Sequence, residues 1–157
     1  MDIRIIGLGN SILTDDGVGI YAVREVSRRL AEAGIVDAVD IVESEVAGFA
    51  LMELMTGWKR VILVDSIQFD DVVPGTVIKI QPDDLRTSLR IRSVHEIDLP
   101  TLVAFGRKLG IPMPETITII GIQAEDALTL GETLTEAAQR GMMAAVDLIL
   151  QEVAGTN

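Results

Sequence analysis

The fold of this chain is decided near its amino terminus by the run Ile3-Arg-Ile-Ile-Gly-Leu-Gly-Asn-Ser-Ile-Leu-Thr-Asp-Asp-Gly-Val-Gly19. Its first part, from Ile3 to Leu8, is short, apolar and rich in isoleucine, and turn-forming residues follow it. This pattern predicts a buried strand that ends in a turn. From Gly17 to Gly34 apolar residues recur at helical spacing, which predicts an amphipathic helix that Gly34 terminates.

Strands and helices continue to alternate along the rest of the chain. Further strands are expected at 39–43, 61–65, 76–80 and 116–122, and further helices at 48–56 and about 98–109. A last helix begins at Thr133, whose spacing to Glu136 matches a capping box, or at Thr135. Because several strands are apolar on both faces, we expect a three-layer α/β/α fold with a largely parallel, five-stranded twisted sheet. The strand at 76–80 follows the previous one too soon for a helical crossover, so we expect it to be hairpin-like, antiparallel and at an edge.

Length and composition favour one domain over residues 1–157, because 157 residues with 48% hydrophobic content bury one sizeable core. No apolar run approaches the roughly 20 residues of a membrane-spanning helix. Asp2 and Arg4 interrupt the place where a signal peptide would begin, so we expect a cytoplasmic protein that does not engage a membrane. The absence of cysteine excludes disulfides, thiolate metal sites and a cysteine nucleophile.

The formal net charge of −11 disfavours nucleic acid as a partner, because it repels a phosphate backbone. The clustered basic residues are Arg86, Arg90 and Arg92. They are interpreted as a solvated loop, with contact to an incoming substrate as the alternative.

The loop after the first strand carries adjacent carboxylates, Asp15 and Asp16. Its glycines suggest a dinucleotide-binding loop, but the spacing fails, because Ile12 occupies the third position of a G-x-G-x-x-G pattern that begins at Gly7 and Gly9. Acidic residues at a helix start also repel pyrophosphate. The two aspartates are candidates for capping the helix or for binding a ligand, and one could do each.

Two further polar residues stand where an α/β sheet binds ligands, outside the carboxyl ends of its strands. Asp65 ends an otherwise apolar strand, as a ligand-binding acid or as a turn residue. His95 is the single histidine and precedes a predicted helix. Carboxylates and an imidazole suit a divalent transition metal and leave coordination positions open. Sequence spacing does not show whether these side chains converge.

The common proteolytic motifs are missing from the sequence. One histidine does not supply H-E-x-x-H, and no serine lies in a G-x-S-x-G elbow. A protease with this sequence would use neither the zinc-protease helix nor the serine-hydrolase turn.

Short motifs along nearly the whole chain resemble those of one family, the hydrogenase maturation endopeptidases. The family trims a C-terminal peptide from the large subunit of nickel-iron hydrogenases. The resemblance is carried, in order, by Gly7-Leu-Gly-Asn10, Asp15-Asp-Gly-Val-Gly19, Val64-Asp-Ser66, Pro74-Gly-Thr76, Ser93-x-His95 and Gly121-Ile-Gln123.

The resemblance implies a function and a site. It implies that Asp16, Asp65 and His95 occupy the catalytic and metal-binding positions of the family. It also implies that the metal is nickel already inserted in the hydrogenase large-subunit precursor, with no organic cofactor. Ser66 stands where many members have alanine, which leaves the role of its hydroxyl open.

The strongest alternative is a receiver-like phospho-acceptor domain, which also combines an acidic pair with an aspartate after the third strand. Against it, the acidic pair lies a loop away from the first strand, and no lysine ends the strand at 116–122. A flavodoxin-like cofactor binder is a second alternative, and it would copurify with a chromophore.

Overall fold

The computed structural model describes residues 2–35, 37, 39–46, 48–82 and 99–155. Its centre is a five-stranded sheet with the strand order β2-β1-β3-β5-β4. Neighbouring strands are parallel except for β4, which is antiparallel to β5 at the edge. The strands are β1 (Ile3–Leu8), β2 (Asp40–Ser44), β3 (Arg60–Ile67), β4 (Val77–Ile80) and β5 (Thr116–Gln123).

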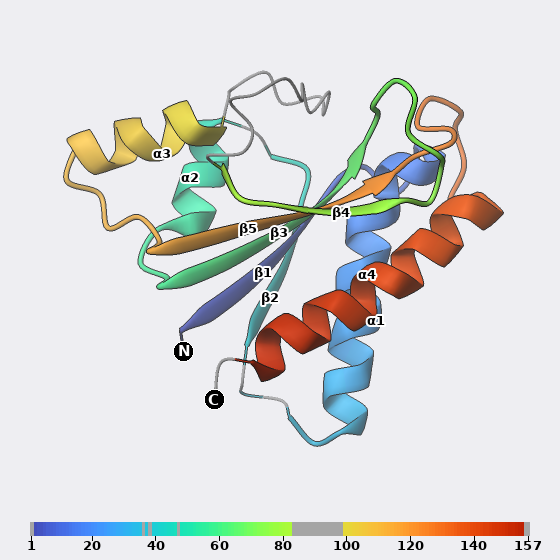
Figure 1. Cartoon of the computed structure of the whole chain (residues 1–157). Helices are drawn as coiled ribbons and strands as arrows, with labels where there is room; N and C mark the ends of the chain where they lie inside the picture. Colours follow the sequence, from blue (N-terminus) through green and yellow to red (C-terminus); the bar gives the residue numbers. More distant parts are fainter. Residues whose placement is uncertain (1, 36, 38, 47, 83–98, 156–157) are drawn as a thin grey trace.

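Helices cover both faces of this sheet, as Figure 1 shows. Helix α1 (Val18–Glu32), entered through a 3-10 turn at Thr14–Gly17, packs with α4 (Glu136–Ala154) over one apolar core. Helices α2 (Phe49–Met55) and α3 (Leu99–Lys108) pack over the core on the other face. The predicted three-layer α/β/α arrangement is therefore confirmed.

The edge strand β4 is antiparallel as predicted, but it does not form a hairpin with β3. Both sides of β3 are occupied, by β1 and by β5, and β4 pairs with the outer side of β5. The loop from β3 crosses the end of β5, where the amide of Gly75 donates to the carbonyl of Gln123 at 2.8 Å. The hairpin expectation was wrong because it considered only loop length, whereas a strand distant in sequence takes the place beside β3.

Glycine lets α1 lie directly on the sheet. A Cβ at Gly19 would stand 2.3 Å from the carbonyl oxygen of Val64 and 2.5 Å from that of Leu8. Such distances are shorter than any real contact, so the helix backbone reaches β1 and β3 only without a side chain there. The glycines of the opening run thus serve close packing of helix on strand.

The start of the last helix resolves the two alternatives left by the sequence. Thr135 is the N-cap residue of α4, and its hydroxyl oxygen accepts a hydrogen bond from the amide of Ala138 at 3.3 Å. The proposed box between Thr133 and Glu136 is not used. No helix within the described part of the chain is long and apolar enough to cross a membrane.

Candidate active site

Asp16 lies at the end of β1 because the following loop folds back on itself. Gly9 has a φ of +139°, and a Cβ there would stand 2.0 Å from the backbone oxygen of Asp16. Only glycine fits this approach. The returning chain brings the carboxylate within 3.0 Å of the amide of Asn10, which donates to Oδ2. Asp16 is only 9% exposed, so its orientation is set by protein neighbours and not by contact with water.

Asp65 meets Asp16 from the neighbouring strand. It lies in β3, two positions before the last strand residue Ile67, and is 7% exposed. Its Oδ1 accepts a hydrogen bond from the amide of Ser66 at 2.8 Å, and the hydroxyl of Ser66 donates to Asp16 Oδ1 at 3.3 Å. Ser66 therefore connects the two carboxylates. The turn interpretation of Asp65 was wrong, because the strand continues through it.

Placing two acids together in a buried position has an electrostatic cost. Burial raises the pKa of Asp65 well above its ordinary value, and the negative charge of Asp16 raises it further. The amide of Ser66 opposes these effects but does not cancel them. A buried acid whose pKa is raised by burial and by a neighbouring charge is more typical of sites that bind or react than of structural positions.

Asp15 has a different task from its neighbour. It is fully buried, and its Oδ2 accepts hydrogen bonds from the amides of Glu125 and Asp126, at 2.9 and 3.1 Å. The amide and hydroxyl of Thr135 donate to the same carboxylate, at 2.9 and 2.8 Å. Asp15 thus ties the loop after β1 to the loop between β5 and α4. Neither aspartate caps α1, whose N-cap is Gly17 without a side-chain cap, so the capping interpretation was wrong.

The sequence of this chain is similar to that of one known family of proteins. Residues 20–152 match the model of a family described as hydrogenase maturation protease. The chain belongs to the hydrogenase maturation protease family. It is 30% identical over 158 residues to a putative hydrogenase maturation protease of Methanocaldococcus jannaschii, covering 97% of this chain and 96% of that protein.

Solved structures of maturation proteases share the fold. The [NiFe] hydrogenase maturation protease HybD of Thermococcus kodakarensis superposes with a TM-score of 0.70 at 28% identity, covering 98% of this chain and 99% of that one. The hydrogenase maturating endopeptidase HybD of Escherichia coli gives a TM-score of 0.79 at 23% identity, covering 100% of this chain and 94% of that one. The receiver-like and flavodoxin-like alternatives are set aside, because the family match identifies a protease.

The third predicted ligand of this maturation protease, His95, lies outside the described residues, as do Arg86, Arg90 and Arg92. Within the part of the chain that is described, no group of three or more potential metal-binding side chains occurs. The structure therefore brings Asp16 and Asp65 together, and the place of His95 in the set stays a prediction.

The sequence indicated Gln123 only as part of a motif at the end of the last strand. The structure gives it a further role. Its buried amide pairs with the backbone of Phe69, donating to the carbonyl at 3.1 Å and accepting from the amide at 3.0 Å. This pairing fixes the loop after Asp65 against the end of β5. A glutamine at the end of an apolar strand is the signal that could have indicated it.

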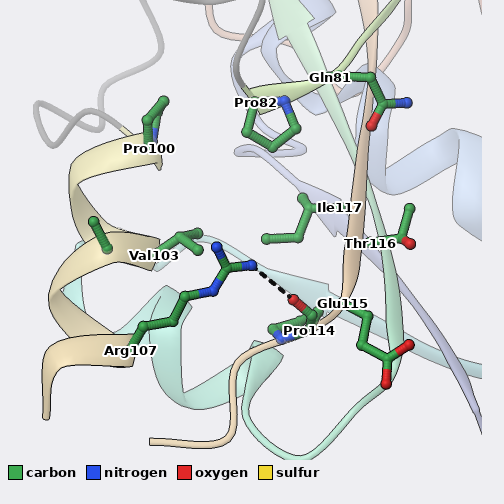
Figure 2. Close-up of a pocket in the computed structure, with 10 residues that line it drawn as sticks. Gln81, Pro82, Pro100, Val103, Arg107, Pro114, Glu115, Thr116 and Ile117 are labelled. Atoms are coloured by element: carbon green, nitrogen blue, oxygen red, sulfur yellow. Dashed lines mark hydrogen bonds between the residues drawn. The ribbon is translucent and has the colours of Figure 1, made fainter. Parts of the chain in front are cut away.

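A pocket among the described residues lies away from these aspartates. Figure 2 shows this cavity of about 390 Å³ beside α3 and the amino end of β5, with Arg107 donating to the carbonyl of Pro114 at 3.3 Å. Asp16 and Asp65 stand at the opposite, carboxyl ends of the parallel strands, where α/β sheets bind ligands. The candidate active site is therefore the aspartate pair, not this cavity beside α3.

The division of labour between the adjacent aspartates can be tested by stability. Asp15→Asn is expected to destabilise the fold by about 2–4 kcal/mol, because an amide nitrogen would face backbone donors that now meet a carboxylate. Asp16→Asn is expected to change stability far less. Urea unfolding of both variants measures the difference, and equal losses would contradict the structural role given to Asp15.

Proposed function

We propose that this chain removes the C-terminal peptide from the precursor of a nickel-iron hydrogenase large subunit, after nickel has been inserted. Family membership supports protease activity toward hydrogenases, and the T. kodakarensis relative is named for [NiFe] hydrogenase. The observation that carries the proposal is the buried pair of Asp16 and Asp65 at the carboxyl ends of the strands. The cytoplasm, as the compartment of this reaction, belongs to the same proposal.

The aspartate pair suits a divalent cation brought by the substrate. Carboxylate oxygens and an imidazole form a donor set that nickel accepts. Burial, and after it the negative charge of Asp16, raise the pKa of Asp65, and a nearby cation opposes both effects by favouring the charged carboxylate. We assign Asp16 and Asp65, with His95 as the third side chain, to contact the nickel of the precursor.

A partial site of this kind reports whether the precursor carries its metal. A few protein ligands bind a free ion weakly, but the ligands of the precursor complete the shell when nickel is present. Affinity then depends on nickel occupancy, and an empty precursor lacks this contact.

The side chains of the site also suit the hydrolytic step. We assign the carboxylate of Asp65 to accept a proton from the water that attacks the peptide carbonyl, since a positioned carboxylate is one of the side chains that act as general bases. The oxygen of water bonds to the carbonyl carbon, the carbon–nitrogen bond breaks, and the proton passes to the leaving amine. Ser66 orients the neighbouring carboxylate of Asp16 during this step.

The proposal is tested with a purified large-subunit precursor, prepared with and without nickel. We expect removal of the C-terminal peptide, detected by mass, to be at least about 100-fold faster for the nickel-loaded precursor, which corresponds to roughly 3 kcal/mol of metal contact. Equal rates for both preparations would refute nickel recognition, and no cleavage of either would refute the assigned substrate.

A further inference from the structure

The loop between β5 and α4 displays apolar side chains beside the candidate active site. Leu128 is 85% exposed and Leu130 is 76% exposed. Ile12, 49% exposed, comes from the loop after β1, which lies alongside because the amide of Gly131 donates to the carbonyl of Ile12 at 2.9 Å. Figure 1 shows this loop after β5, in orange, beside the start of α1. We call Ile12, Leu128 and Leu130 the leucine rim.

The leucine rim stands on an ordered backbone. Asp126 Oδ1 accepts hydrogen bonds from the amides of Leu128 and Thr129, each at 3.0 Å. The hydroxyl of Thr14 donates to the carbonyl of Thr129 at 2.5 Å, and Asp15 holds the beginning of the loop. Because the backbone of this loop is already ordered, little further backbone entropy is lost when a partner covers its exposed apolar side chains. Such side chains are suited to be binding anchors.

An acidic pocket adjoins the leucine rim. This cavity of about 280 Å³ is lined by Phe69 and Leu128 and by the carboxylates of Asp70, Glu125 and Asp126. Hydrogen bonds from the hydroxyl and the amide of Thr129 lower the pKa of Asp126, which keeps it ionised. No lysine or arginine is among the described residues that line the pocket. The surface is therefore apolar on one side and negatively charged on the other.

Hydrogen bonds tie this surface to the loops that follow the aspartate pair in the chain or precede it. The pocket lies between the loop that follows β3 and the loop that follows β5, which Gln123 binds to Phe69. Asp15, which anchors the rim loop, is the chain neighbour of Asp16. A polypeptide that presents a bond to the aspartates would extend over this surface.

We infer that the leucine rim and the acidic pocket are the docking surface for the body of the precursor, through a patch that combines apolar side chains with lysine or arginine. The inference rests on the proposed function for the identity of the partner. Apolar anchors supply the affinity, and the negative pocket selects a basic partner and speeds its approach.

The test measures the dissociation constant for the nickel-loaded precursor by titration, and cleavage separately. Leu128→Ser with Leu130→Ser is expected to weaken binding by about tenfold or more while kcat changes less than about twofold, because both side chains are exposed on a loop outside the aspartate pair. Leu109→Ser is the matched control, since this leucine is also exposed, at 59%, but follows α3 at the other end of the sheet. Asp70→Asn with Glu125→Gln is expected to weaken binding several-fold and to reduce its salt dependence.

Unchanged affinity in the double leucine variant, with circular dichroism showing a folded protein, would overturn the inference. So would an equal loss in Leu109→Ser. Sedimentation of the wild type and the same variants tests whether the leucine rim joins two copies of this chain instead. A wild-type dimer that the leucine changes dissociate would also overturn the inference. Rim-dependent binding without cleavage would instead support the docking surface and refute the proposed function.

Discussion

Asparagine in place of Asp65 is expected to slow cleavage of the precursor by on the order of a thousandfold and to raise the melting temperature by a few degrees. The loss of activity follows from the proposed contact with nickel and with the attacking water. The gain in stability follows because the variant no longer buries a carboxylate against the charge of Asp16. Single-turnover cleavage and thermal unfolding measure the two effects on one preparation.

The stability gain of Asp65→Asn should depend on pH. In the unfolded chain the carboxyl has its ordinary pKa of 3.8, whereas burial raises the pKa in the folded protein. Stability of the wild type therefore falls as the pH rises from the ordinary value through the raised one. The variant has no proton to lose there, so its advantage should vanish below about pH 4 and grow above it.

Asp71→Asn is a suitable control for this prediction, because Asp71 is exposed in the loop after β3 and has a φ of 63°, which asparagine also tolerates. It should change neither cleavage nor stability. A variant at Asp65 that cleaves the precursor at the wild-type rate would show that the site is elsewhere.

Alanine in place of Gly19 is expected to destabilise the protein by about 3 kcal/mol or more. The added methyl group would collide with the carbonyl oxygens of Val64 and Leu8, which are backbone atoms of two central strands. Neither strand can move without loosening the sheet, so α1 must lift away and its apolar face must lose contact. Urea denaturation measures the loss as a lower midpoint.

Ser27→Ala on the exposed side of the same helix is the matched control, because it adds no atom toward the sheet and improves helix propensity. It should leave the midpoint unchanged or slightly higher. A midpoint for Gly19→Ala equal to that of the wild type would show that the helix can move away from the sheet without a loss of stability, and would contradict this prediction.

Much of the fold was predictable from local composition. Each central strand is an apolar, β-branched run, and each helix shows an apolar stripe, so their existence and order follow from the chain itself. The pairing of β4 was not predictable, because it depends on β5, which the chain reaches only after α3. The local sequence pattern predicts where a strand lies in the chain, but not which strand it pairs with in the sheet.

The candidate site was predictable in part. Carboxylates at strand ends indicated Asp16 and Asp65, and the family motifs joined them with His95. Nothing in the local pattern separated Asp15 from Asp16, because both are acids at the start of one helix. The exposed leucines of the rim were also missed, although two leucines in a polar loop are a visible signal.

By itself the sequence determined the alternation of strands and helices, the acids at the strand ends and the family. The family motifs already singled out Asp16, but only the tertiary structure decided that Asp15 ties two loops together. The physical reason is that the partners of Asp15, from Glu125 to Thr135, are 110 to 120 positions away in the chain. A carboxylate takes its role from the donors that surround it, and folding brings those donors from elsewhere in the chain.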